Sequence, residues 1–457
     1  MNPVSEITKL RRDLFTSVAR WALKNIGSKP SEHDIANMVK ELVPDGPPRY
    51  RCCIHKERAV ARERIIIALG LHNSQSDNQP ITVISEACNG CSLIKYVITD
   101  ACQNCVAHPC RNSCPKKSIS VIQNRAYIDQ NSCIECGKCA RSCPYNAIVE
   151  ITRPCERACA VKAIKVDDSR KAILDLGKCV SCGHCVSVCP FGAITDLSQI
   201  CKVINSLYQP TQPLAAIIAP SIAGQFGPKV SPGQIKSALI KLGFNLVIEA
   251  ALGADIVANH EAKELQEKTT GGLLVNSCCY PFSRTATNIS PELSKHLSSS
   301  LSPMRATGKL VKDKYEGQIT TIFIGPCIGK KAEATLGNEI DLVITFEELA
   351  ALFIAADIDP STQEELALKD ASTKGRLFAK AGGVATAVSS QVTNIALKVA
   401  SVQGLGPCIT SLKSSVKDLK EGRYLFLECM ACEGGCVGGP GTLVSPAAAV
   451  RALEKHS

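Results

Sequence analysis

The sequence lacks any continuous apolar run that approaches the ~20 residues needed to span a membrane. Its start, Met1 to Arg20, alternates charged with apolar side chains and has no continuous apolar centre, which argues against a secretory signal. Glycine and proline, at 31 and 24 of 457 residues, have ordinary abundance, and 45% of the residues are hydrophobic, so disorder is not favoured. We therefore expect about three folded domains, in a cytoplasmic protein without a membrane partner.

A dinucleotide-binding fingerprint is also missing. Gly404-Leu405-Gly406 has the Gly-x-Gly pattern, but we expect no strand and helix around it, so it does not indicate a nicotinamide or flavin site. Cysteine, by contrast, is abundant, with 26 residues. So many cysteines in a chain without an export signal favour thiolate–metal chemistry in a reducing cytoplasm over disulfides.

Two cysteine runs have the spacing of bacterial ferredoxins. They read Cys133-x2-Cys136-x2-Cys139-x3-Cys143-Pro144 and Cys179-x2-Cys182-x2-Cys185-x3-Cys189-Pro190. In such a run three thiolates hold one 4Fe-4S cube, and the fourth, followed by Pro, ligates the other cube of the pair. A lone Cys-x2-Cys pair would be equally compatible with a zinc knuckle or a redox pair, but two full runs are not. The sequence therefore predicts an electron-carrying protein.

The cysteine-dense region from 88 to 189 contains sixteen cysteines, enough for four cubes. A third run, Cys102-x2-Cys105-x4-Cys110-x3-Cys114-Pro115, has a slightly enlarged loop and precedes Cys133–Cys143 at ferredoxin distance. Crossed ligation predicts one cube on Cys102, Cys105, Cys110 and Cys143, and another on Cys133, Cys136, Cys139 and Cys114.

The second ferredoxin repeat is incomplete. Cys155-x3-Cys159 resembles the last two cysteines of a run whose first two are missing. Cys88-x2-Cys91 could supply them from upstream, which predicts cubes on Cys179, Cys182, Cys185 and Cys159, and on Cys88, Cys91, Cys155 and Cys189. A free thiol pair or a zinc site at Cys88 and Cys91 is the alternative. Cysteines without a partner pattern are expected to be structural: Cys52, Cys53, Cys201 and Cys408.

The formal net charge of +10 would by itself favour a nucleic-acid partner. An oxidised cube with four thiolates carries about −2, so five such clusters would contribute about −10 and bring the protein near neutrality. We therefore expect no nucleic-acid partner.

The pattern of apolar residues and cysteines divides the chain into three segments. Residues 1–85 are expected to be helical, because Leu10, Leu14, Val18 and Trp21 recur at helical spacing. Residues 86–204 are expected to form two dicluster ferredoxin-like units. Residues 205–457 alternate strand-like and helical runs, so the fold class is a multidomain combination of α+β and α/β. The strand-like runs are Leu214–Ala219, Leu246–Ile248, Leu273–Val275, Thr320–Ile324, Leu342–Ile344 and Tyr424–Leu427, and the main helical run is Val384–Val399.

Three cysteine loops follow strand-like runs in the last segment. They read Asn276-Ser277-Cys278-Cys279-Tyr280-Pro281, Gly325-Pro326-Cys327-Ile328-Gly329-Lys330 and Cys429-Met430-Ala431-Cys432-Glu433-Gly434-Gly435-Cys436. Four thiolates from distant strand ends suit one more cube, because open α/β sheets place their chemistry at the carboxyl edge. Ala219-Pro220-Ser221 is a fourth loop of this kind, and the glycine pair before Cys436 permits close backbone approach to a large cofactor.

At these loops, from about residue 205 to 445, the chain resembles the iron-only (FeFe) hydrogenases. The resemblance implies a two-lobed α/β catalytic domain with an H-cluster, in which a 4Fe-4S cube is joined to a two-iron subcluster carrying CO, cyanide and an azadithiolate bridge. It implies cube ligation by Cys279, Cys327, Cys432 and Cys436, the last bridging to the two-iron subcluster. It further implies proton exchange through Cys278 and donation to cyanide by Lys330 and by Pro220-Ser221. Met430 would pack against the two-iron subcluster, and Glu261 and Glu264 would relay protons.

The sequence departs from the family pattern at two positions. Tyr280 stands between the paired cysteines and the Pro that usually follows them directly, and Gly325 replaces the usual Met. These changes favour a divergent branch resembling group B and do not touch a metal ligand.

The resemblance implies reversible interconversion of protons and electrons with dihydrogen in an anaerobic cytoplasm. Electrons would pass through the cubes to or from ferredoxin or a partner subunit, and maturation proteins would insert the two-iron subcluster. The alternatives are an H2-sensing homologue with low turnover and a non-catalytic iron–sulfur assembly protein. An assembly relative would be expected to lose Cys278, Lys330 or a cube ligand, and this chain keeps all of them.

Overall fold

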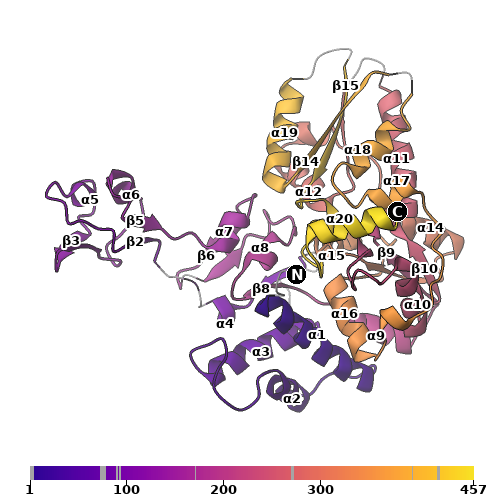
Figure 1. Cartoon of the computed structure of the whole chain (residues 1–457), viewed down its shortest axis with the longest axis horizontal. Coiled ribbons are helices and arrows are strands. Elements are labelled where there is room, and N and C mark those ends of the chain that lie inside the picture. The colour runs from indigo at the N-terminus through magenta and orange to yellow at the C-terminus, as the bar shows by residue number, and fades with distance from the viewer. Residues whose placement is uncertain are drawn as a thin grey trace.

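The computed structural model describes residues 5–72, 79–88, 91, 94–169, 171–268, 272–393, 395–418 and 423–457. Figure 1 shows a large α/β body, a helical N-terminal part below it and an iron–sulfur arm that projects to one side. Among the described residues, no helix combines the length and apolarity that crossing a membrane requires.

Three helices make up the N-terminal part: α1 (Glu6–Lys24), α2 (Glu32–Leu42) and α3 (Ile54–Ala68). Ser31 begins α2 with a capping box in which its side chain and that of Asp34 satisfy each other's backbone N–H groups. The helical periodicity seen in the sequence buries Leu14 and Val18 of α1 in the same hydrophobic core as Ile217. The N-terminal helices therefore share the core of the C-terminal domain instead of forming one of their own.

The first ferredoxin-like unit lies at the far end of the arm (Figure 1). Two antiparallel pairs frame it, with Tyr96 opposite Glu150 in one and Ile119 opposite Ile128 in the other. Its elements are β2 (Tyr96–Ile98), α5 (Pro109–Asn112), β3 (Ile119–Ile122), β4 (Arg125–Ile128), α6 (Lys138–Ser142) and β5 (Ile148–Glu150).

The second unit is built from two separate parts of the chain. The upstream strand β1 (Ile81–Val83) pairs antiparallel with β8 (Ile194–Asp196), with the first ferredoxin-like unit between them in sequence. The short helix α4 (Ser85–Cys88) follows β1 and brings Cys88 into this unit. The remaining elements are α7 (Pro154–Ala158), β6 (Ile164–Val166), β7 (Ala172–Leu174) and α8 (His184–Val188).

Two parallel sheets form the C-terminal body. One has the order β10-β9-β12-β13 and the other β11-β15-β14. The strands of the first are β9 (Leu214–Ile218), β10 (Leu246–Glu249), β12 (Thr320–Ile324) and β13 (Leu342–Ile344). The strands of the second are β11 (Gly272–Val275), β14 (Leu397–Gln403) and β15 (Tyr424–Met430). All five residues of β9 are buried, as expected for a parallel strand covered on both faces.

Helices cover the two sheets (Figure 1). They are α9 (Ile200–Tyr208), α10 (Pro232–Leu242), α11 (Ala250–Gln266), α12 (Tyr280–Ile289), α13 (Pro291–Ser294), α14 (Pro303–Lys314), α15 (Gly329–Glu333), α16 (Phe346–Ala355), α17 (Thr373–Leu377), α18 (Gly383–Ser389), α19 (Leu405–Lys417) and α20 (Pro446–Lys455). Glu428 of β15 anchors α18, because its buried carboxylate accepts from the backbone N–H of Gly382 at 2.6 Å and of Ala385 at 2.7 Å.

Two expectations from the sequence are wrong in this body. The helical run Val384–Val399 ends at Ser389, and Leu397–Gln403 is the strand β14. The end of the expected helical run forms a strand because it pairs with β15: β14 lies parallel to β15 along its whole length. Gly404-Leu405-Gly406 does stand between a strand and a helix, β14 and α19. The fingerprint is still incomplete, since Ile409 occupies the position of its third glycine.

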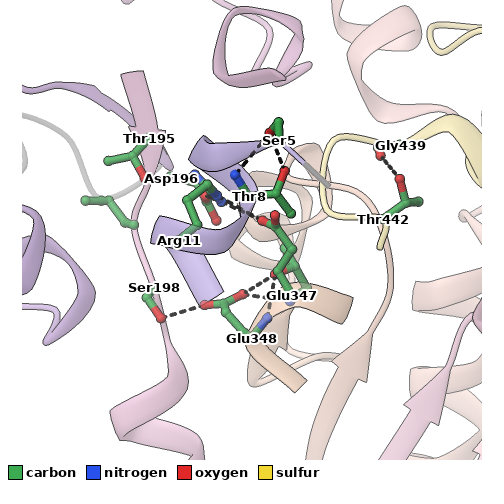
Figure 2. Close-up of polar contacts among 12 residues, drawn as sticks. Ser5, Thr8, Arg11, Thr195, Asp196, Ser198, Glu347, Glu348, Gly439 and Thr442 are labelled. Carbon is green, nitrogen blue, oxygen red and sulfur yellow. Dashed lines mark hydrogen bonds and ion pairs between the residues drawn. The ribbon is translucent and has the colours of Figure 1, made fainter. Parts of the chain in front are cut away.

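Buried ion pairs join α1, the end of the second ferredoxin-like unit and the C-terminal body. Arg11 donates to Asp196 at 2.9 Å and to Glu347 at 2.8 Å. Lys331 lies 2.7 Å from Asp196 and 2.9 Å from Glu348. Figure 2 shows Arg11 beside both Asp196 and Glu347, with Ser198 donating to Glu348 nearby. Burial alone would lower the pKa of Lys331, but the charges of Asp196 and Glu348 more than offset it and raise that pKa.

Removal of Lys331 should therefore destabilise the whole assembly. In Lys331→Met, Asp196 and Glu348 lose a shared cation at a site where both side chains are fully buried, which should cost about 3–5 kcal/mol. The denaturation midpoint measures this loss. Lys380→Met is the matched control, because its pair with the half-exposed Glu454 should contribute no more than about 1 kcal/mol. Equal effects of the two substitutions would contradict the prediction.

Candidate active site

The carboxyl ends of strands from both sheets meet at one small cavity of about 70 Å³. β9 delivers Pro220 and Ser221 to it, and β11 delivers Cys278. Further residues of the cysteine loops line the same cavity: Pro326, Cys327, Lys330, Met430 and Cys436. The sequence placed these groups at strand ends, and the structure brings them together between the two sheets.

Four cysteines of the loops lie within electrostatic reach of one another. Burial raises the pKa of the Cys432 thiol, and the charges of Cys327, Cys279 and Cys436 raise it further. Burial is also the main reason that the pKa of Cys279 is raised to about 11, and the charge of Cys327 adds to it. Such thiols are stable as thiolates only beside a strong positive charge, and four soft sulfur donors suit an iron–sulfur cube. The donor set therefore fits the cube that the resemblance implies.

The paired cysteines, Cys278 and Cys279, face different surroundings. Cys278 lines the cavity and accepts a hydrogen bond from Asn276 Nδ2 at 3.1 Å. Cys279 Sγ instead accepts from the backbone N–H of Ala431 at 3.4 Å, on the side of the Cys432 loop. Asn276 Oδ1 also accepts a hydrogen bond from the backbone N–H of Cys429 at 2.7 Å. The Asn276 amide therefore connects the two loops and orients Cys278.

Two polar groups of the cavity suit an anionic ligand. Lys330 is buried, and its Nζ donates to the carbonyl of Cys278 at 3.1 Å and to Glu333 at 2.5 Å. Burial alone would lower the pKa of Lys330, but Glu333 and Cys327 more than offset that effect, so this side chain is a cation. The buried hydroxyl of Ser221 has no hydrogen-bond partner among the described residues. A bound ligand with acceptor atoms would satisfy both groups.

The two departures from the family pattern have local explanations. A Cβ at Gly325 would lie 2.5 Å from the ring of Phe323, which lines the cavity. Phe323 thus occupies the space beside Gly325. Tyr280 begins α12 and its hydroxyl accepts from Arg284 at 2.8 Å, so the extra phenol is committed to that helix.

The glycine pair before Cys436 serves backbone packing. Gly435 has φ +87°, and an added Cβ would meet the backbone nitrogen of Ala381 at 2.7 Å. Glycine is therefore required here for close approach to the segment before α18.

A line of carboxylates and hydroxyls leads from Cys278 toward the surface. Glu261 is fully buried on α11 and accepts from the N–H of Ser277 and from Ser300 Oγ, each at 3.4 Å. Ser300 Oγ lies 2.8 Å from Ser298 Oγ, and Ser298 donates to Glu264 at 2.6 Å. Glu264 is less buried, and it is 3.8 Å from the half-exposed His260. The line therefore connects the buried cavity wall with solvent.

The two carboxyl groups have opposite pKa shifts. Burial raises the pKa of Glu261 to about 8, and the charge of Glu264 acts in the same direction. Burial also acts to raise the pKa of Glu264, but hydrogen bonds from Ser298 and Ser299 more than offset it and lower that pKa. Neighbouring carboxyls pushed apart in this way can act as proton donor and acceptor at neutral pH.

The cysteines of the first ferredoxin-like unit group as crossed ligation requires. The charges of Cys105, Cys143 and Cys102 raise the pKa of Cys110, after burial as the main cause. For Cys139, burial comes first, and the charges of Cys133 and Cys114 also raise the pKa. Each group thus includes one cysteine from the opposite run.

The second unit groups in the same way and includes the upstream pair. Burial raises the pKa of Cys155 to about 11, with added contributions from Cys189 and Cys91. Cys91 in turn lies within the influence of Cys189 and Cys88. The other group surrounds Cys185, whose pKa is raised by burial and then by the charges of Cys182, Cys179 and Cys159. Among the described residues, no group of three His, Cys, Asp or Glu side chains is close enough to hold a single metal ion. This finding concerns single-ion sites, because the thiolates around a 4Fe-4S cube each bind a different iron and stand farther apart.

The second unit packs directly against the cysteine loop of β12. A Cβ at Gly183 would lie 3.0 Å from the side chain of Ile328, and one at Gly329 would lie 3.3 Å from the carbonyl of Ser181. Cys182 therefore neighbours Cys327. The pKa of Cys182 is raised mainly by burial, then by the charges of Cys179 and Cys159, and also by the charge of Cys327.

Sequence patterns missed several residues of the site. Asn276 and Glu333 stand in or next to the cysteine loops but received no role from the sequence, and Ser298 and Ser300 reach the line of carboxylates only through folding. The run of three serines from 298 to 300 is the one signal in the sequence that could have indicated the hydroxyls.

These features define an iron–sulfur protein with a cysteine-lined cavity in its α/β body. Residues 212–440 match the iron-only hydrogenase large subunit, C-terminal domain. The chain therefore belongs to the iron-only hydrogenase family, as its cysteine loops predicted. Residues 126–149 match the 4Fe-4S binding domain, and residues 149–200 match the LdpA Fe-S cluster-binding domain.

Three relatives illustrate the range of similar proteins. Iron hydrogenase 1 of Clostridium pasteurianum is 28% identical over 298 residues, which cover 52% of this chain and 52% of the relative. The large subunit of the periplasmic Fe hydrogenase of Nitratidesulfovibrio vulgaris is 29% identical over 272 residues, 48% of this chain and 64% of the relative. The cytosolic Fe-S cluster assembly factor NAR1 of Yarrowia lipolytica is 24% identical over 317 residues, 50% of this chain and 64% of the relative. The chain thus spans between half and two thirds of these relatives.

Proposed function

We propose that the protein interconverts protons and electrons with dihydrogen at an H-cluster. The observation that carries the proposal is the cavity at the strand ends, where Cys278, Lys330 and the unpaired Ser221 hydroxyl stand beside Cys327 and Cys436. A role in cluster binding alone would need the four thiols but not a cationic and a hydroxyl donor facing a separate cavity.

In this proposal Cys279, Cys327, Cys432 and Cys436 hold the cube, with Cys436 also facing the two-iron subcluster. When bound, that subcluster supplies an open iron that polarises H2 as a Lewis acid. Lys330 and the Pro220-Ser221 loop would provide donors for its cyanide groups, and Met430, which lines the same cavity, would pack beside it. The apolar residues of the cavity wall, such as Phe323 and Met304, keep bulk water away.

Protons move along side chains of this chain. Cys278 Sγ is a neutral thiol at neutral pH, because burial raises its pKa and the charge of Glu261 raises it further. It exchanges a proton with Glu261, which passes it through the hydroxyls of Ser300 and Ser298 to Glu264. Glu264 then exchanges with solvent.

Electrons enter and leave through the arm. The contact of Gly183 and Ser181 with the β12 loop places the group around Cys182 next to the catalytic thiols. The first ferredoxin-like unit, at the far end of the arm, is the docking point for a ferredoxin or a partner subunit in the cytoplasm (Figure 1).

Infrared spectra after treatment with maturation proteins test the proposal. We expect CO and cyanide bands, together with H2 oxidation by a viologen dye. Bands with very low turnover would indicate a sensing homologue. The similarity to the NAR1 assembly factor favours, as a second candidate, a non-catalytic role in iron–sulfur assembly. Absence of both bands and turnover in protein with complete cubes would support that role and reject the hydrogenase.

Replacement of Cys88 and Cys91 by Ser should remove one cube. Sixteen ferredoxin-type and four catalytic thiolates predict five cubes, hence about 20 irons before the two-iron subcluster is inserted and about 22 after. The double variant should contain about four fewer, with its infrared bands intact. Iron quantification on anaerobically reconstituted protein measures the difference. An unchanged iron count would show that the pair ligates no cluster, and about 12 irons in the unaltered protein would contradict the four-cube assignment.

A further inference from the structure

One peptide group beside Cys189 is held from both ends. Its N–H, from Ala193, donates to Cys189 Sγ at 3.2 Å. Its carbonyl, from Gly192, accepts from Arg64 Nη2 at 3.2 Å. Arg64 also donates to the carbonyl of Phe191 at 2.8 Å. A guanidinium on the carbonyl polarises the amide and strengthens the hydrogen bond from its N–H to sulfur.

A second arginine from the N-terminal part joins the two cysteine segments of the same group. Arg51 donates to the carbonyl of Ala87, next to Cys88, and to the carbonyl of Phe191, each at 3.3 Å. Its guanidinium also lies 5.6 Å from the centre of the Phe191 ring. Both arginines thus donate to the carbonyl of Phe191, two residues after Cys189, and Arg51 also donates to the carbonyl next to Cys88.

Glycine at position 192 makes room for this arrangement. The residue three after the last cysteine of each run has a positive φ: +52° at Lys117, +49° at Asn146, +53° at Lys162 and +54° at Gly192. The first three carry side chains. A Cβ at Gly192 would lie 3.0 Å from Arg64 Nη2, so a side chain there would displace the guanidinium. The positive φ alone therefore does not require glycine at this position. Glycine is needed at 192 because Arg64 occupies the space that a side chain would fill.

Arg64 remains a cation in this position. Its pKa is lowered to about 10, mainly by burial and also by the charges of Arg51 and Arg11, while the charges of Cys189 and Glu57 act in the opposite direction. Glu57 is itself engaged by the N–H groups of Arg49 and Tyr50 at 2.8 and 3.2 Å. At neutral pH the positive charge therefore stands next to a cysteine ligand and acts on its thiolate.

We infer that Arg64, with Arg51, raises the reduction potential of the cube held by Cys88, Cys91, Cys155 and Cys189, so that the N-terminal helices tune one station of the electron path. The inference rests on the ligand set proposed above. Reduction adds one electron, and so one negative charge, to the cube. A nearby cation and a strengthened amide–sulfur bond stabilise that reduced form more than the oxidised form.

Anaerobic redox titrations followed by electron paramagnetic resonance test this role in reconstituted protein, with dithionite as the reductant. In Arg64→Gln the equilibrium constant for reduction of one cluster should fall about tenfold, which corresponds to about 59 mV for one electron. Arg51→Gln should lower the same potential. Arg64→Lys keeps the charge and should restore most of the loss. Arg62→Gln, on the exposed face of α3 where Arg62 pairs with Glu32, is the matched control and should change nothing.

Gly192→Asn supplies an independent variant in which neither arginine is substituted. Asn adopts the same φ at position 146, so the backbone should persist while the added side chain displaces Arg64. We expect the same fall in potential. Arg51 and Arg64 line a cavity of about 430 Å³, so shortened side chains there face open space and folding should survive.

The background that lacks Cys88 and Cys91 identifies the cluster concerned. There the titrating species should be missing, and Arg64→Gln should shift nothing further. A shift that persists in this background would assign the effect to another cluster and overturn the inference. Unchanged potentials in Arg64→Gln and Gly192→Asn, at full iron content, would also overturn it. None of these readouts depends on CO or cyanide bands, so failure here is distinct from failure of the proposed H2 chemistry.

Discussion

Cys278→Ala is expected to keep the CO and cyanide bands but lose about 10² to 10⁴ in H2 turnover, the contribution of a general acid–base group. The neighbouring substitution Cys279→Ala is expected to lose both the bands and the turnover. The difference follows from the two environments: Cys278 lines the cavity beside Asn276, whereas Cys279 Sγ faces the Cys432 loop through Ala431. One substitution removes a proton carrier and the other removes a ligand of the cube.

Infrared spectroscopy and viologen-linked H2 oxidation on the same samples separate the two outcomes. Cys201→Ala is the control. Cys201 belongs to α9, outside the cysteine loops, and packs against the hydrophobic core, so its replacement should preserve both signals. Wild-type turnover in Cys278→Ala with intact bands would contradict the relay. Tyr280 would be a poor substitute, because its hydroxyl is paired with Arg284. Lys330, whose Nζ lies 3.1 Å from the Cys278 carbonyl, would be the next residue to test.

The spacing of cysteines predicted far more of this site than the composition did. The strand ends at Ile218, Val275 and Ile324 could be predicted to within one residue, because buried parallel strands give short apolar runs and the candidate site residues follow them closely. The pair Cys155 and Cys159 indicated an incomplete repeat that needs two more thiols, and Cys88 and Cys91 were the nearest unassigned pair. In the structure β1 and α4 bring Cys88 close to Cys189, although nothing in the intervening sequence predicts the pairing of β1 with β8.

Long-range partners could not be read from the sequence. Lys331 follows Lys330 directly, yet one faces the cavity and the other bonds Asp196, 135 residues away. The N-terminal helices were readable as helices but not as part of the catalytic core or as neighbours of a cluster. Arg64 is one of several arginines in α3, and only the backbone around Gly192 distinguishes it. The identity and spacing of the cysteines predict the cluster ligands. The residues that contact those ligands' neighbours, such as Arg64, depend on how distant elements pack.

Glu261→Gln is expected to lower H2 turnover by about 10² to 10⁴ with the infrared bands unchanged. Glutamine keeps the size of the side chain and can still hydrogen-bond Ser277 and Ser300, but it cannot bind and release a proton. Glu264→Gln should have a smaller effect, because this carboxyl is nearer to solvent and water can replace it. Glu267→Gln, at the exposed end of α11, is the matched control.

The raised pKa of Glu261 adds a test that is independent of turnover. Below its ordinary pKa of 4.5 the carboxyl is neutral in both the folded and the unfolded chain; between 4.5 and about 8 the unfolded chain is ionised while the folded protein keeps the proton. Unfolding therefore releases a proton in this range, and the contribution of Glu261 to stability falls as pH rises towards 8. Glu261→Gln should remove that slope, so its denaturation midpoint should exceed that of the wild type more at pH 8 than at pH 5. The wild-type pH–rate profile should likewise have a limb near pH 8 that the variant lacks. A variant with the wild-type limb and the wild-type rate would place the proton path elsewhere.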